Sequence, residues 1–297
     1  MRLPRLRRPL PRDYWQREIA QRDPEADWAE IFRWVAGHEF PWEIQRGTEL
    51  AFFRTYAVPE IAELLAETRA LIDETEKRFD DTAIVLVEAG RYVEGNSEDL
   101  TAIRRMNQMH GAYDIPQDQM LYVLTTFVVT ARRWADRYGY RKLTDPEVTS
   151  MVRYWQRMGQ LMGIRDIPDD YAGFEDYFDA YERDRFGYSD GGRAIADATL
   201  GLLASYFPAP LRPLILSVLC SLLDPHLRRA LGYDDPPAIT SALVEAALGL
   251  RRLVVARMPA RRESRSPLDM MKLRTYPQGY DIAQVGTFPA RRAAAVD

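Results

Sequence analysis

Apolar residues recur every three or four positions over most of this chain, which is the period of one face of an α-helix. The longest such face begins after Pro116 and ends at Gly139, and it consists of Met120, Leu121, Leu124, Phe127, Val128, Ala131, Trp134, Ala135 and Tyr138. A second face, from Val148 to Met162, follows Thr144-Asp-Pro-Glu147, a capping box with proline in the first turn. Only Ala83–Val87 would suit a strand equally well. The pattern therefore predicts an all-α chain.

Proline and capping residues divide the chain into its expected helices. Helices are predicted to begin near Asp23, Pro41, Pro59 and Asn96, and a last long helix is predicted from Ala238 to Met258. The most apolar stretch, residues 199–223, is interrupted by three prolines, so it predicts two buried helices joined by a turn. No repeat or Gly/Ser-rich linker divides the body. We therefore expect a basic N-terminal arm at 1–22, one helical domain at 23–258, and a basic tail without regular structure at 259–297.

Charge is distributed unevenly along the chain. The net charge is −4, but residues 1–12 carry +5 and residues 251–297 carry +6, so residues 13–250 carry −15. The acidic body disfavours nucleic acid as a partner, because it would repel phosphates. The basic ends could lie against that body or contact an anionic membrane surface. No apolar run follows the arginine-rich start, so we expect a cytoplasmic protein and leave peripheral membrane contact open.

Few kinds of chemistry have sequence support. The GxGxxG, P-loop, GxSxG and HExxH motifs are absent, and Cys220 is the only cysteine. Asp80 and Asp81 are neighbours that point apart on a helix, so they do not suggest a carboxylate-bridged di-iron site. Of the three histidines, His110 falls on an apolar helical face behind Met106. One neutral imidazole is what a haem iron requires, although a lone histidine on such a face is more often a packed core residue.

Several segments together resemble a known family. They are Arg78-Phe-Asp-Asp-Thr82, Gly90, Ala102–Gly111 and Leu121–Thr125, with further similarity at Phe40–Glu43, Phe53–Pro59, Met162–Ile164, Ile167-Pro168 and Tyr276–Tyr280. This set, which extends over roughly residues 40–287, resembles the MpaB and rubber-oxygenase (latex-clearing-protein) family of haem b oxygenases, and is closer to the MpaB branch. The resemblance implies a mostly helical fold with a globin-like haem pocket.

The resemblance also implies roles for individual residues. His110 would be the iron ligand, and Arg78 and Thr82, one helical turn apart, would line the oxygen side of the pocket. Asp81 joins them as a catalytic candidate, because it stands where rubber oxygenases have a lysine that can occupy the distal iron site. Beside His110, Met106 and Asn107 are candidates for cofactor contact. The simpler alternatives are a salt bridge from Arg78 to Glu74 or Asp81, and a capping or back-bonded hydroxyl at Thr82.

The implied function is a haem b-dependent oxygenase. It would use dioxygen to oxidise or cleave a C=C bond of an apolar, prenylated or similar small molecule. Two other functions stay open: a non-enzymatic haem module that senses or carries a gas through His110, and a haem-free helical interaction protein in which His110 is merely packed. Extracellular rubber is not an expected substrate, and the sequence leaves the oligomeric state open.

Overall fold

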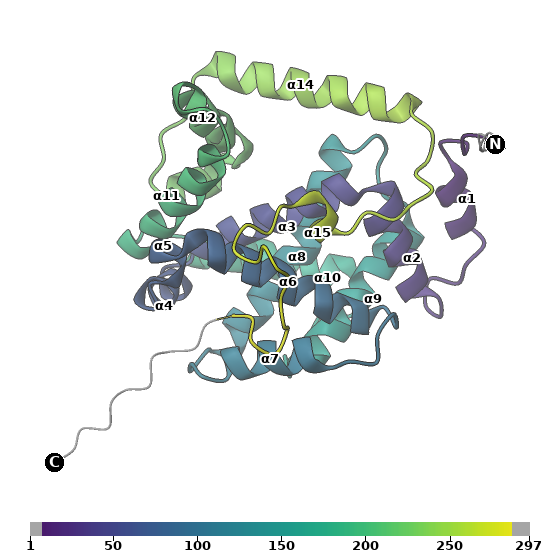
Figure 1. Ribbon diagram of the computed structural model, residues 1–297, viewed down its shortest axis with the longest axis horizontal. Helices are drawn as coiled ribbons and strands as arrows, with labels where there is room; N and C mark the ends of the chain where they lie inside the picture. Colours follow the sequence, from purple (N-terminus) through teal and green to yellow (C-terminus); the bar gives the residue numbers. More distant parts are fainter. Residues whose placement is uncertain (1–7, 287–297) are drawn as a thin grey trace.

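The computed structural model describes residues 8–286, and most of these residues are helical (Figure 1). The predicted all-α fold is confirmed: the described range contains no strand, and a single antiparallel bridge joins Leu10 to Ala260. The helices are α1 Tyr14–Ile19, α2 Trp28–Trp34, α3 Pro41–Tyr56, α4 Pro59–Glu67, α5 Ala70–Asp73, α6 Thr75–Val93, α7 Thr101–His110, α8 Gln117–Tyr138, α9 Asp145–Leu161, α10 Tyr171–Arg185, α11 Asp190–Ser205, α12 Arg212–Leu222, α13 Pro225–Ala230, α14 Ala238–Arg257 and α15 Pro267–Met270. A π-helical turn, η1 (Val35–Glu39), follows α2, and a 3₁₀ turn, η2 (Ala209–Leu211), precedes α12.

Helix ends follow the local signals of the sequence. Prolines open α3 and α4, and the predicted capping box opens α9, where the Thr144 amide donates to Glu147 at 2.7 Å. Residues 83–87 lie inside α6, so the helical alternative is confirmed there. The helix expected from Asp23 begins only at Trp28, and residues 24–26 form a separate turn in which the Asp27 amide bonds to the Asp23 carbonyl.

The core is built around α8. This helix is buried over most of its length and packs against α3, α9 and α10. Its contact with α3 requires glycine: a Cβ atom at Gly47 would lie 2.4 Å from the Cα atom of Ala131. Phe127 of α8 also stacks on Trp155 of α9, with ring centroids 4.7 Å apart. The globin-like character of a haem pocket in this core stays a prediction, as does the division at residues 22 and 258.

The expectation of two buried helices in residues 199–223 is wrong for the second one. One side of α11 is buried, and α11 packs against α4, whereas no residue of α12 is buried. The turn that contains Pro208 and Pro210 directs the chain away from the core, and Pro213 lies in the first turn of α12. The second helix packs instead on α11 and α14 (Figure 1). Among the described helices, none combines the length and the apolar composition needed to cross a membrane.

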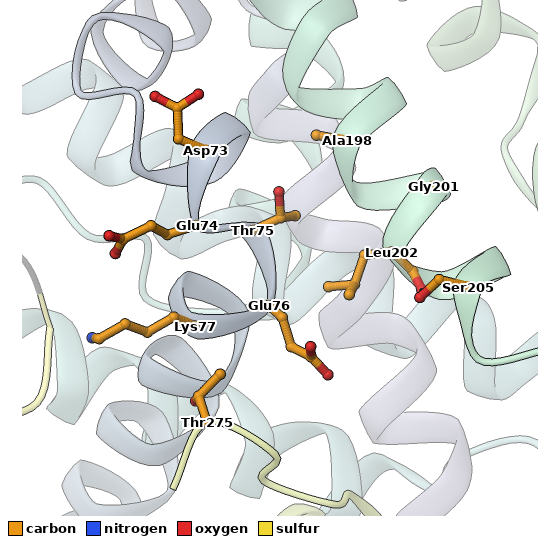
Figure 2. A pocket seen from close by; sticks show the side chains of 10 residues that line it. All are labelled: Asp73, Glu74, Thr75, Glu76, Lys77, Ala198, Gly201, Leu202, Ser205 and Thr275. Atoms are coloured by element: carbon orange, nitrogen blue, oxygen red, sulfur yellow. The ribbon is translucent and has the colours of Figure 1, made fainter.

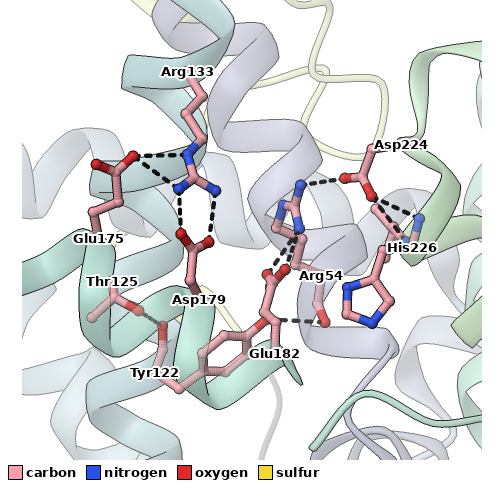
Figure 3. A network of polar contacts seen from close by, with 10 residues as sticks. Arg54, Tyr122, Thr125, Arg133, Glu175, Asp179, Glu182, Asp224 and His226 are labelled. Atoms are coloured by element: carbon pink, nitrogen blue, oxygen red, sulfur yellow. Dashed lines mark hydrogen bonds and ion pairs between the residues drawn. The ribbon is translucent and has the colours of Figure 1, made fainter. Parts of the chain in front are cut away.

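A charged network connects α3, α10 and the start of α13 (Figure 3). Arg54 donates to both carboxylate oxygens of Glu182, at 2.8 and 2.7 Å, and also to Asp224, the N-cap of α13. Glu182 differs from acidic residues of α10 such as Asp179, which is exposed, because its own side chain is buried. Burial raises the pKa of Glu182 to about 7, although Arg54 acts to lower it.

The residues after α14 pass across α6 and α7 as an ordered strap, defined here as residues 259–286. Arg265 donates its amide to the Gly37 carbonyl at 2.8 Å, and the short α15 lies against α6. At the far end Val285 is buried, and its carbonyl accepts from Arg105 at 2.7 Å. The tail predicted to lack regular structure is thus largely irregular and closely packed. Residues 1–7 and 287–297 of the predicted arm and tail lie outside the described range.

Candidate functional site

Helix α6 brings Arg78 and Thr82 together. The Arg78 guanidinium donates to the Thr82 hydroxyl, and that hydroxyl donates to the Arg78 carbonyl at 2.7 Å. The back-bonded hydroxyl expected as the simpler alternative for Thr82 is therefore confirmed. The alternative for Arg78 is not: within residues 8–286 this side chain forms no salt bridge, either with Glu74 or with Asp81.

Arg78 carries a positive charge in surroundings that disfavour it. Burial lowers the pKa of its guanidinium, while Tyr56, Asp81 and Tyr113 oppose that effect. A buried charge without a close counter-charge is costly, so a protein that retains one commonly uses it. The charge is available to an anionic or strongly polar group that enters next to Thr82.

His110, the last residue of α7, has a largely buried imidazole. Its Nδ1 atom is buried and makes no hydrogen bond. Burial and the charge of Arg78 lower the pKa of His110, and the main chain of Met106 has a smaller opposite effect. The imidazole is therefore neutral near pH 7, which is the form that binds a metal. The structure thus brings three predicted residues, Arg78, Thr82 and His110, to one place between α6 and α7.

Asp81 points toward the strap. Its carboxylate is bound by Lys77 at 2.8 Å and by the Tyr276 hydroxyl. Asp80, the preceding residue, accepts from the Thr275 hydroxyl at 2.7 Å. Asp81 follows Arg78 by three residues on α6 and lies close enough to influence its charge, but Lys77 and Tyr276 hold the Asp81 carboxylate toward the strap. The structure gives Asp81 an anchoring role, and its predicted catalytic role stays a prediction.

Replacing Tyr276 with phenylalanine is expected to destabilise the protein by about 1–2 kcal/mol, because the buried Asp81 carboxylate would lose a hydrogen-bond donor. Urea unfolding followed by circular dichroism measures this change. Tyr188→Phe is the matched control, since its hydroxyl donates to the exposed Asp190. Equal losses in the two variants would contradict an anchoring role for Tyr276.

The two candidates that precede His110 have structural contacts of their own. Met106 is buried in the core. The Asn107 amide donates to the Leu161 carbonyl at 2.8 Å and so joins α7 to the end of α9. Their predicted contacts with a cofactor stay predictions.

Sequence reasoning did not select two tyrosines that lie near Arg78. Tyr56 ends α3 and Tyr113 follows α7, and both are close enough to influence the charge on the guanidinium. Tyr56 lies inside the Phe53–Pro59 segment of the resemblance, which is the one signal that could have identified it. Nothing in the local pattern around Tyr113 separates it from an ordinary loop residue.

An open hollow lies at the beginning of α6 (Figure 2). It is lined by Asp73, Glu74, Thr75, Glu76, Lys77, Ala198, Gly201, Leu202, Ser205 and Thr275. The hollow therefore adjoins the helix turn that carries Arg78, between α6, α11 and the strap. Among the described residues, no cluster of three or more His, Cys, Asp or Glu side chains could hold a bare metal ion. A haem iron needs one protein ligand, which His110 can provide.

Comparison with known proteins agrees with this geometry. The family model described as ER-bound oxygenase mpaB/B′/rubber oxygenase, catalytic domain, matches residues 56–256, a span that contains Arg78, Thr82 and His110. The chain belongs to this family. The predicted resemblance is thereby confirmed.

Curated relatives agree with the family assignment. The chain is 26% identical over 239 residues to the ER-bound oxygenase mpaB′ of Penicillium brevicompactum, which covers 74% of the chain and 56% of the relative. It is 25% identical over 224 residues to the ER-bound oxygenase mpaB of Penicillium roqueforti (strain FM164), which covers 69% of the chain and 75% of the relative. The chain thus spans little more than half the length of the first relative.

Proposed function

We propose that this mpaB/rubber-oxygenase family member is a haem b-dependent oxygenase. Its reaction would use dioxygen to oxidise or cleave a C=C bond in an apolar small molecule. The relatives are named as oxygenases, which supports the class of reaction. The observation that carries the haem assignment is the buried Nδ1 atom of His110, which has no hydrogen-bond partner.

The residues between α6 and α7 fit a haem group. A buried imidazole nitrogen without a hydrogen bond is unusual in a histidine kept only for packing, and a haem iron requires one nitrogen of a neutral imidazole. His110 is neutral near pH 7, as such ligation requires. The partly buried Arg78 guanidinium, which forms no ion pair within the described range, would balance negative charge brought in with the group or its oxygen ligand.

Arg78, Thr82 and the apolar side chains of α7 and α8 would have different roles in the proposed reaction. When bound, the haem supplies the redox-active iron that chemistry with dioxygen requires. Arg78 attracts and orients polar oxygen atoms, and Thr82, fixed by its bond to the Arg78 carbonyl, keeps the guanidinium on the inner face of α6. The apolar side chains of α7 and α8, including the buried Met106 and Leu121, exclude water and suit an apolar substrate.

The visible spectrum of protein purified from haem-supplied cells tests this proposal. We expect a Soret band and a pyridine haemochrome of b-type haem in the wild type, and loss or alteration of that band in His110→Ala. His226→Ala is the matched control, because the exposed His226 ring contacts Phe186 and is far from α7 in sequence, and this variant should keep the wild-type spectrum. Oxygen consumption with apolar alkenes then tests turnover.

Two outcomes would contradict the proposal. A folded protein that stays colourless after haem is added would indicate a helical interaction protein in which His110 is packed. A coloured protein that binds dioxygen but consumes none with any alkene would indicate a gas sensor or carrier.

A further inference from the structure

Helix α14 exposes an apolar stripe that no other described element covers. The stripe consists of Ile239, Leu243, Ala246, Leu250 and Val254, which recur at helical spacing on one face. Ile239, Leu243 and Leu250 are 71%, 65% and 63% exposed. Large side chains exposed side by side on one helix mark an interaction site, whereas single exposed ones are ordinary.

The helix is anchored to the domain through a different face. Thr240 is buried there, and Arg251 donates to Glu43 at 2.7 Å and lies over the ring of Trp42. The only acidic residue of α14, Glu245, accepts from Arg137 and Tyr138 of α8, each at 2.7 Å. The acid is therefore neutralised by the body of the protein. In Figure 1, α14 runs along the outer edge of the molecule from α12 toward the side where α1 lies.

Arginines gather at the C-terminal end of the stripe. Arg252 and Arg257 are exposed and form no ion pair with any described residue. The bridge from Leu10 to Ala260 brings the described part of the N-terminal arm to this place, and Arg262 donates to the Arg8 carbonyl there. Residues 246–268 contain six arginines and one acid, Glu263. Arginines of the strap and of the C-terminal end of α14 thus lie next to the apolar stripe.

We propose that this face, the apolar stripe of α14 with the arginines at its end, docks on an anionic lipid surface. A helix that combines an apolar stripe with arginines lies in the plane of a bilayer interface, where its side chains enter the acyl boundary and its cations meet phosphates. A second copy of the chain fits less well, because the face offers almost no acids to pair with its arginines. The proposal is independent of the haem assignment, since it involves neither His110 nor Arg78.

Flotation with vesicles tests the apolar half of the face. The full-length wild type is expected to bind vesicles of phosphatidylcholine mixed with phosphatidylserine. Leu243→Gln combined with Leu250→Gln should lower the partition coefficient about tenfold or more, because two apolar insertions are lost. Leu243→Met with Leu250→Met is the matched control and should keep wild-type binding. Both positions are exposed, so circular dichroism should show an unchanged fold.

The cationic half has its own test. Arg252→Gln combined with Arg257→Gln should weaken binding to phosphatidylserine vesicles about tenfold or more, and high salt should remove the difference. Arg183→Gln is the control, because Arg183 is exposed on α10 and, among the described residues, is paired with its neighbour Asp184.

Vesicle binding that the α14 variants leave unchanged would overturn the proposal. The face would instead be assigned to a second copy of the chain if the wild type did not bind vesicles and formed a dimer. In that case Leu243→Gln combined with Leu250→Gln should convert the dimer to a monomer.

Discussion

Arg54→Met is expected to destabilise the protein by about 3–5 kcal/mol, because it leaves two carboxylates without their cation in a largely buried position. Burial disfavours the charged guanidinium of Arg54, but Glu182 and Asp224 outweigh this and raise its pKa. The network joins α3, α10 and α13 (Figure 3), so its loss affects three contacts at once. Urea unfolding of the two proteins measures the difference.

The cost of Arg54→Met is also expected to grow with pH. The pKa of Glu182 is raised from 4.5 to about 7 in the folded state, so its contribution to stability is present below its ordinary pKa and is lost as pH rises through about 7. Arg54 lowers that pKa, and without it the loss continues above pH 7. The gap between variant and wild type should therefore be wider at about pH 8 than at about pH 5.

Arg133→Met is the matched control for this first prediction. Arg133 also pairs with two carboxylates, Glu175 and Asp179, but its side chain is 41% exposed. An exposed pair contributes little, so this variant should lose about 1 kcal/mol or less. Equal losses at Arg54 and Arg133, or a pH-independent gap at Arg54, would contradict the buried-network explanation.

Arg78→Met is expected to raise stability by about 1 kcal/mol or more while lowering the proposed oxygenase activity about 100-fold. Stability should rise because methionine removes a charge that burial disfavours and no described carboxylate balances by direct pairing. The proposed activity should fall because the site beside Thr82 would lose the Arg78 charge, and one such donor is commonly worth a hundredfold in rate. Opposite changes in the two quantities are typical of a residue kept for function at the expense of stability.

Titration of the His110 imidazole distinguishes a functional role of Arg78 from a purely structural one. The charge of Arg78 lowers the pKa of His110, so Arg78→Met should raise the pKa of the imidazole, as followed by NMR in haem-free protein. Arg78→Lys keeps the charge and should leave that pKa low. A variant that is less stable than the wild type, with an unchanged His110 titration, would show that Arg78 supports the fold only.

Much of the helical framework could be predicted from local sequence. The starts of α3, α4 and α9, the end of α8 before Gly139, and the helical state of residues 83–87 follow from caps, prolines and apolar period. The shared face of Arg78 and Thr82 is equally local, because a spacing of four residues places both on one side of any helix. The family assignment depended on the same segments.

Other features could not be predicted, because they depend on which helix faces which. The acidic residues of α10 look alike in sequence, yet Glu182 is buried against Arg54 and Asp179 is exposed. In the sequence, Asp81 looks like any solvated acidic residue of a helix. What distinguishes it is the hydrogen bond from Tyr276, which lies 195 residues further along the chain. The missing partner of the His110 Nδ1 atom likewise appears only when every neighbouring donor and acceptor is placed.

By itself, therefore, the sequence determined the helices, their ends and the residues that share a helical face, since hydrogen bonds and side-chain contacts within four residues decide these. The tertiary structure alone decided which charges are buried, how the strap is held, and where Leu10 meets Ala260. Those outcomes depend on contacts between segments far apart in the chain, whose formation requires that the loop-closure entropy be overcome by packing of the whole domain.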